Sequence, residues 1–120
     1  MPQFMLILHE TPGDFAKLSP TEIQAIIERY GAWTMKVAAA GKLVGGHKLM
    51  ENGGKVVAKA GDQLKLVDGP YSEAKEVVGG YFILRADDYD DVHQWIEGHP
   101  HLDFGRIEVR EVDFMGQPES

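Results

Sequence analysis

Two short, uninterrupted apolar runs constrain the fold of this chain more than any other feature. The first is residues 4–8, and the second is residues 81–84, at the end of a longer run that begins at Val77. Runs of this length between polar residues are typical of strands that are buried on both faces. Such strands lie in the middle of a sheet, so the other elements must be arranged around them.

A long amphipathic helix is predicted after the first of these strands. Ser19 can cap it, Pro20 suits its first position, and Glu22 completes a capping box three residues after Ser19. Gly41 is typical of the residue just past a helix end. The apolar stripe between these signals consists of Ile23, Ile26, Ile27, Tyr30, Trp33 (or Thr34) and Val37.

The remaining segments predict a second strand over residues 43–50, a hairpin over residues 56–67, a short helix capped by Asp87 or Asp88, and a half-exposed strand over residues 107–112. With the two apolar strands, the order is that of an α+β, ferredoxin-like βαββαβ domain with an inserted hairpin. We expect a single domain over residues 1–115 and a flexible tail over residues 116–120.

Two helices can cover only one face of such a sheet. The other face also carries apolar residues, drawn alternately from the two central runs, and needs a partner. Two-fold homodimers are the commonest oligomers, so we expect a second copy packed sheet to sheet. The alternative is a monomer whose hairpin folds over that face.

Composition excludes several classes of partner. The 120 residues carry a formal charge of −7, and the lysines and arginines are scattered, which argues against binding nucleic acid or an anionic membrane. There are no cysteines for disulfides, thiolate ligands or a nucleophile. The first residues have neither the basic region nor the small-residue cleavage site of a secretory leader, so we expect a cytoplasmic protein. The glycine pairs do not form a phosphate-binding loop before a helix.

Residues 68–76 read Asp-Gly-Pro-Tyr-Ser-Glu-Ala-Lys-Glu and resemble the signature of the YCII-related (DGPF) family, with Tyr71 in place of phenylalanine. Gly79-Gly80-Tyr81, a helix with tryptophan after Ala86-Asp87-Asp88, and the last strand also match in order. The resemblance implies a dimeric α+β barrel with a cleft between sheet and helices. Relatives on this barrel include small-molecule lyases, isomerases and oxygenases, and some DGPF-like proteins are linked to sigma factors.

One feature of the family is not carried over. A smaller branch resembling YCII has a histidine at the start of the first long helix and an aspartate in the turn before the last strand, suggested as an acid–base pair. Here those positions read Pro20-Thr21-Glu22 and His99-Pro100. Any catalysis must therefore use other residues.

The signature loop supplies the first candidates. Asp68 could act as a general base, while Lys75, Glu73 and Tyr71 could bind a ligand, with Lys75 holding an anionic group. The alternative is structural, because an Asp-Gly-Pro sequence favours a turn in which the aspartate accepts bonds from nearby backbone amides.

Three histidine positions are further candidates. His9 ends the first buried strand and suits proton transfer, because histidine changes charge near neutral pH. His47 follows Gly45-Gly46, where small residues allow a ligand to come close. His99-Pro100-His101, with Asp103 nearby, resembles a poor metal site, and a solvated turn is the favoured interpretation. We expect neither a metal nor a cofactor.

The sequence therefore predicts a cytoplasmic homodimer that binds a small organic molecule, for example as a cofactor-free lyase or isomerase. Asp68 and His9 would be its catalytic residues, and Lys75, Glu73, Tyr71 and His47 would contact the ligand. The alternative is a non-catalytic regulatory or binding module that works beside a transcription-related partner.

Overall fold

The computed structural model describes residues 1–51, 54–68 and 76–118. Their strands are β1 (Gln3–Glu10), β2 (Leu43–Lys48), β3 (Lys55–Ala60), β4 (Gln63–Asp68), β5 (Val77–Arg85) and β6 (Gly105–Glu111). The helices are α1 (Pro20–Ala39) and α2 (Tyr89–Ile96), with short 3-10 turns η1 (Phe15–Lys17) and η2 (Pro100–Asp103). Within these residues no helix is both long and apolar enough to cross a membrane.

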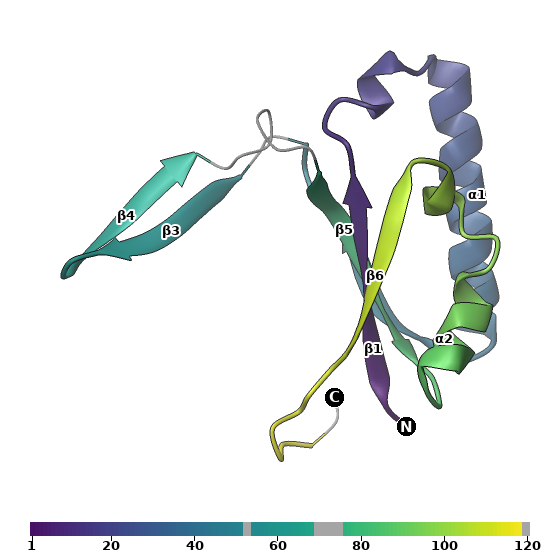
Figure 1. The fold of residues 1–120 in the computed structure, drawn as a ribbon. Coiled ribbons are helices and arrows are strands. Elements are labelled where there is room, and N and C mark those ends of the chain that lie inside the picture. Colours follow the sequence, from purple (N-terminus) through teal and green to yellow (C-terminus); the bar gives the residue numbers. More distant parts are fainter. Residues whose placement is uncertain (52–53, 69–75, 119–120) are drawn as a thin grey trace.

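The main sheet is antiparallel and has the order β2-β5-β1-β6. The two strands predicted to be central, β1 and β5, are central. Both helices lie against the same face of this sheet (Figure 1). The α+β ferredoxin-like fold with an inserted hairpin is thus confirmed.

Helix α1 begins and ends where its end signals predict. The Ser19 side chain accepts a hydrogen bond from the backbone N–H of Glu22, and the Glu22 carboxylate accepts one from the backbone N–H of Ser19. These two bonds satisfy backbone donors that an open helix end leaves without partners. Gly41 follows the helix with a φ of 73°, in the left-handed region that glycine adopts without strain.

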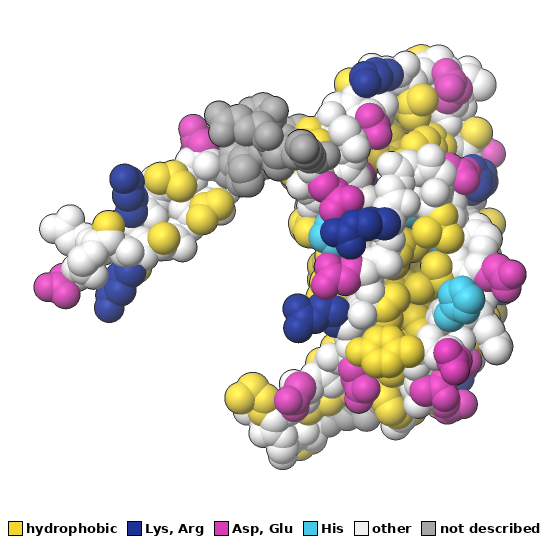
Figure 2. Space-filling model, in the orientation of Figure 1, with side chains coloured by type: hydrophobic (Ala, Val, Ile, Leu, Met, Phe, Trp, Pro, Cys, Tyr) yellow, Lys and Arg dark blue, Asp and Glu magenta, His cyan; other side chains and the backbone are white. Residues whose placement is uncertain are grey.

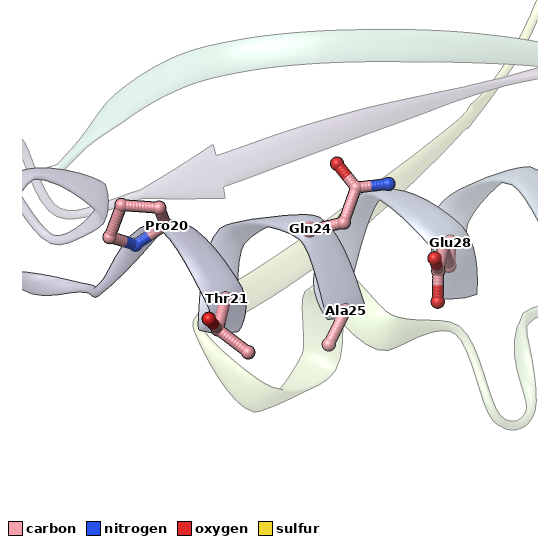
Figure 3. A pocket seen from close by; sticks show the side chains of 5 residues that line it. All are labelled: Pro20, Thr21, Gln24, Ala25 and Glu28. Carbon is pink, nitrogen blue, oxygen red and sulfur yellow. The ribbon is translucent and has the colours of Figure 1, made fainter.

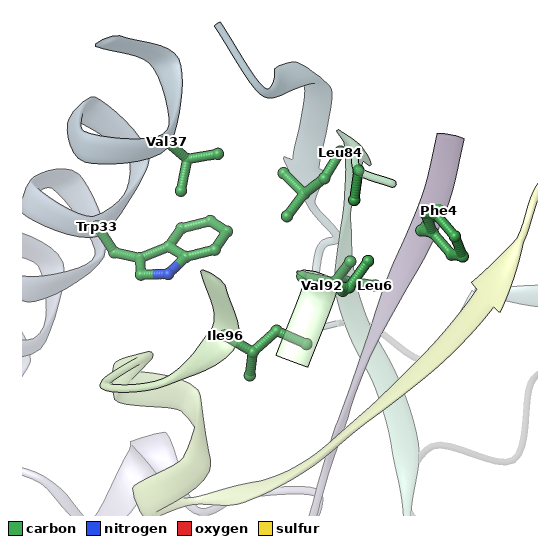
Figure 4. Packing of buried hydrophobic residues seen from close by; sticks show 8 residues of the cluster. Phe4, Leu6, Trp33, Val37, Leu84, Val92 and Ile96 are labelled. Atoms are coloured by element: carbon green, nitrogen blue, oxygen red, sulfur yellow. The ribbon is translucent and has the colours of Figure 1, made fainter. Parts of the chain in front are cut away.

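The core lies between the sheet and the two helices (Figure 4). It combines alternate residues of the central strands with the inner stripes of both helices: Phe4, Leu6, Trp33, Val37, Leu84, Ala86, Val92 and Ile96. The indole N–H of Trp33 donates to the backbone carbonyl of Trp95 at 2.8 Å, which joins the two helices. Burial of these side chains is the main source of stability in this layer.

The opposite side of the sheet, here called the open face, carries the other set of alternate residues. Cross-strand pairing puts Ile7 beside Tyr81 and Glu108, and His9 beside Arg106. His47 of β2 pairs with Tyr81 on the same face. No helix covers this face among the described residues, although Met5, Ile7 and Ile83 on it are only partly exposed.

Strands β3 and β4 form the predicted hairpin as a separate two-stranded sheet. It does not fold over the open face, because every residue of both strands is exposed. Figure 1 shows it extending away from the main sheet on the side opposite the helices. The structure therefore differs from the alternative in which the hairpin of a monomer covers the open face of its own sheet.

Candidate functional site

His9 lies on the open face, at the end of β1. Its Nε2 is 2.8 Å from Glu108 Oε1. A carboxylate oxygen can only accept, so the proton of this bond is on Nε2. Glu108 reaches His9 because both lie on the same face of adjacent strands, with Ile7 and Glu108 directly opposite.

A second carboxylate, that of Glu76, lies against the other edge of the His9 ring. His9 Nδ1 is 3.5 Å from Glu76 Oε1. The Arg106 guanidinium holds the same carboxylate in two-pronged fashion, with Nε at 3.0 Å from both oxygens and Nη2 at 2.6 Å from Oε1. Hydrogen bonding from Arg106 lowers the pKa of Glu76, so Glu76 stays ionised.

We call these four residues, His9, Glu76, Arg106 and Glu108, the His9 cluster. The His9 side chain is 14% exposed, while the two carboxylates and the guanidinium are more open to solvent. The cluster therefore places the His9 ring between the Glu76 and Glu108 carboxylates, with Arg106 holding Glu76 in position. Arg106 uses Nε and Nη2 for Glu76, while its Nη1 makes no hydrogen bond to any of the described residues.

His47 lies on the same face as His9, as a ligand-contacting residue would need to. Its Nδ1 is hydrogen-bonded to the Tyr81 hydroxyl at 2.9 Å, and the two rings are tilted against each other. Tyr81 is the cross-strand neighbour of Ile7 in β1. The open face therefore carries a histidine–tyrosine pair on β2 and β5 beside the His9 cluster on β1 and β6.

The structure does not bring Asp68 to His9. Asp68 ends β4, and its carboxylate forms an ion pair with Lys55, its cross-strand partner in the hairpin. Its side chain is largely exposed. Tyr71, Glu73 and Lys75, the other candidates of the signature loop, lie outside the described residues.

Three members of the His9 cluster were missed by the sequence reasoning. Glu76 is in the signature but has no role in the sequence-based prediction, Glu108 is a polar position of the predicted last strand, and Arg106 lies just before that strand. Their alternation with Ile107 and Val109 was the available signal. It placed both charges on one face, but only strand pairing shows that this face includes His9.

The turn that contains His99 and His101 is buried, which corrects the prediction of a solvated turn. The two residues are only 2% and 1% exposed. Pro100 opens the short turn η2, which tucks against β6 and α1. The His101 Nε2–H donates to the backbone carbonyl of His9 at 2.7 Å, and the Tyr30 hydroxyl donates to His101 Nδ1 at 2.9 Å.

His99 is enclosed by aromatic rings. Its Nδ1 accepts from the backbone N–H of His101 at 3.0 Å, so in the neutral ring the proton is on Nε2. That nitrogen is buried and has no hydrogen-bond partner among the described residues, and the Trp33 ring centroid lies 4.3 Å from the His99 centroid. Burial lowers the pKa of His99 to about 4, and burial also lowers the pKa of His101. Both rings are structural and neutral near pH 7.

The nitrogens of this pair are thus occupied by protein groups or enclosed by rings, an arrangement unsuited to a metal ion. Across the described ranges, no group of three or more His, Asp or Glu residues gathers with metal-site geometry.

Glu10 is the buried carboxyl group on the helix side of β1. Burial raises its pKa, and the charge of Lys48 partly offsets this effect. Gly79 makes room for it, because a Cβ there would lie 1.5 Å from Glu10 Oε1. Adjacent residues His9 and Glu10 therefore occupy opposite faces with different surroundings.

A shallow hollow lies on the first half of α1 (Figure 3). Its lining consists of Pro20, Thr21, Gln24, Ala25 and Glu28. These residues are exposed, and Glu28 is the single ionisable group among them. The hollow brings no reactive groups together, so we assign the candidate site to the open face.

Comparison with known proteins identifies the family. One similar solved structure is the 5-chloro-2-hydroxyhydroquinone dehydrochlorinase of Burkholderia phenoliruptrix, in complex with 2,5-dihydroxybenzoquinone. It is 16% identical over 92% of this chain and 93% of that one, with a TM-score of 0.46. No curated protein matches the chain. The family model of the YCII-related domain matches residues 3–115. The chain belongs to the YCII-related domain family.

Proposed function

We propose that the chain acts as a cytoplasmic homodimer that binds a small organic molecule on the open face and catalyses proton transfer to or from it, as a cofactor-free lyase or isomerase. The observation that carries the proposal is His9, whose ring is held by Glu108 at Nε2 and faces Glu76 at Nδ1. The proposed site thus lies on the side of the sheet opposite the helices, rather than in a cleft beside them.

The reaction step needs a base, a group that stabilises the base after protonation, and an anchor for developing negative charge. Neutral His9 would take a proton from the ligand at Nδ1. Glu108 would keep its bond to Nε2–H and, with Glu76, stabilise the imidazolium. Arg106 Nη1 would hold an enolate or phenolate oxygen, and the proton on Nδ1 would return to another atom of the ligand.

The homodimer is proposed from the apolar residues of the open face. Met5, Ile7 and Ile83 lie there without a covering layer in the described part of the chain. A second copy packed on this face by two-fold symmetry would bury them and exclude water from the His9 cluster. Light scattering after gel filtration at micromolar concentration should report twice the chain mass.

The chemistry is tested by solvent deuterium exchange. Proton NMR would follow deuterium uptake at acidic carbons in a panel of small 2-oxo acids and dihydroxybenzenes incubated with the protein in heavy water. We expect protein-dependent exchange in at least one compound, reduced at least a hundredfold by His9→Gln. His93→Gln is the matched control, because His93 is an exposed histidine on α2.

Two outcomes would count against this proposal. Equal exchange rates for His9→Gln and the unchanged chain would remove His9 from the reaction. Binding of a panel compound to the open face, without exchange in any of them, would favour the non-catalytic binding module instead.

A further inference from the structure

The β3–β4 hairpin exposes apolar side chains that a free hairpin would not be expected to keep in water. All residues of both strands are exposed, and they include five large apolar ones: Val56, Val57, Leu64, Leu66 and Val67. An isolated two-stranded hairpin is at best marginally stable in water. Contiguous exposed apolar residues on a soluble domain commonly mark an interaction surface.

Strand pairing gathers the largest of these side chains on one side of the hairpin. Val57 is directly opposite Leu66, and Leu64, two residues before Leu66 in β4, is opposite Lys59. Residues two apart on a strand and directly opposite across a pair share a face. We call Val57, Leu64 and Leu66 the hairpin apolar face; Leu64, 75% exposed, is its most open member.

The described chain is also too extended for a self-contained domain of its size. Its radius of gyration is 16.5 Å, and its extents are 47 × 46 × 19 Å. A compact chain of this length has a radius of gyration of about 14 Å. The excess comes from the hairpin, which leaves the body on the side of the open face (Figure 1). Figure 2 shows the molecule deeply hollowed between the hairpin and the body.

We infer that the hairpin is a clasp that closes over a second copy of the chain seated on the open face. This inference rests on the proposed homodimer and assigns a role to the hairpin within it. A copy placed on the open face enters the hollow beside the hairpin, and two-fold symmetry makes the clasp reciprocal. Each hairpin would then cover apolar surface that neither copy can cover alone.

Charge also favours a second copy as the occupant. The hairpin carries three lysines against two aspartates, so the rest of the chain holds a formal charge of −8. Lys55 is paired with Asp68, whereas Lys59 and Lys65 form no ion pair with any described residue. A hairpin with a net positive charge is therefore complementary to an acidic body. It would also offset part of the repulsion between two acidic bodies.

The clasp would complete the site as well as the dimer. β4 leads through the signature segment to Glu76, which belongs to the His9 cluster and immediately precedes β5. A second copy held in the hollow would enclose the open face, where His9 and Arg106 lie. Solvent would then be kept from the proton-transfer groups, as closed active sites require.

The first test compares dimer dissociation constants by sedimentation equilibrium. The variant Leu64→Asp/Leu66→Asp places two charges on the hairpin apolar face, and we expect its dimer to dissociate at least tenfold more readily. Met35→Asp is the matched control, because Met35 is 74% exposed on α1, on the body. We expect its dissociation constant to match that of the unchanged chain.

The second test asks which copy the hairpin contacts. In a mixture of carbon-13-labelled and unlabelled chains, isotope-filtered NMR detects contacts between molecules alone. We expect contacts from the methyl groups of Val57, Leu64 and Leu66 to the unlabelled chain. Hydrogen exchange of residues 55–68 should also quicken on dilution into the monomer range.

The outcomes separate the clasp from the homodimer. A monomer at the concentration of the NMR sample would overturn both. A dimer whose dissociation constant is unchanged by Leu64→Asp/Leu66→Asp, or whose hairpin contacts arise only within one molecule, would overturn the clasp alone. A dimer with the clasp but without deuterium exchange by His9 would leave the clasp standing and remove the catalytic proposal.

Discussion

At the scale of single residues, the side of the sheet decides what each titratable group can do. His9 and Glu10 are neighbours in β1, yet His9 meets Glu108 and Glu76 on the open face while Glu10 is buried on the helix side. The sequence could name His9 as a candidate because it ends an apolar run. It could not name Glu76 and Arg106 as its neighbours, because that contact depends on β1, β5 and β6 lying side by side.

The buried His99 predicts that stability falls in mild acid. Its pKa is about 4 in the folded chain against 6.5 for the free side chain, so the unfolded chain binds more protons between these values. The stability that neutral His99 contributes is fully present above pH 6.5 and is lost as the pH falls towards 4. The lowered pKa of His101 acts in the same direction, whereas the raised pKa of Glu10 acts in the opposite one. For His99 the loss would be roughly 3 kcal/mol, from 1.36 kcal/mol for each pH unit.

Thermal unfolding between pH 7.5 and 4 checks this prediction. His99→Asn keeps an acceptor for the His101 N–H but cannot titrate, so its melting temperature should fall less steeply with pH. His93→Gln, at an exposed position, should follow the unchanged chain. A slope in His99→Asn as steep as in the unchanged chain would assign the acid sensitivity to other groups.

At the scale of elements, the segments with strong local signals were predicted well and the irregular ones were not. α1 runs between the cap at Ser19 and the stop at Gly41, and the hairpin predicted over residues 56–67 forms with one further residue at each end. The second strand ends at Lys48, two residues earlier than predicted. Residues 99–101 were expected to be solvated because a short turn has no periodicity to reveal its buried side. The buried side of this turn is evident only from its packing on β6 and α1 in the folded chain.

Gly105, the first residue of β6, shows how closely the start of β6 and the adjoining η2 approach the end of β1. A Cβ at this position would lie 1.9 Å from the His9 carbonyl oxygen and 3.2 Å from His101 Nε2. Because the nearest atom is backbone, it cannot swing aside. We expect Gly105→Ala to displace η2, break the bond from His101 to His9 and lower the free energy of unfolding by about 3 kcal/mol.

Gly31→Ala is the control for that substitution. Gly31 lies inside α1, and a Cβ at this position would have nothing within 4 Å beyond its own helix backbone and chain neighbours, so alanine adds helix propensity without a clash. It should raise the free energy of unfolding by ~0.8 kcal/mol. Urea unfolding of the two variants measures both effects, and equal responses to the two alanines would contradict the packing described for Gly105.

At the scale of the whole molecule, the chain divides into a body that contains the core and a hairpin outside it. The core cluster draws on β1, α1, β5 and α2, with the Ala86 that follows β5, and on no residue of β3 or β4. The alternation of apolar residues predicted that the open face needs a partner. It could not predict that the hairpin would stand away from the body, because that depends on how the chain leaves β2 and enters β5.

This division predicts that the body folds without the hairpin. Replacing residues 52–75 by a short Gly-Ser turn would join β2 to β5, which are already antiparallel neighbours with Leu49 N–H bonded to the Gly79 carbonyl at 2.9 Å. At concentrations where both chains are monomeric, we expect the free energy of unfolding to change by less than ~1 kcal/mol, because no core residue is lost. The near-ultraviolet circular dichroism from the packed Trp33 should also persist. A shortened chain that lacks this signal and binds hydrophobic dyes would show instead that the body depends on the hairpin within a single molecule.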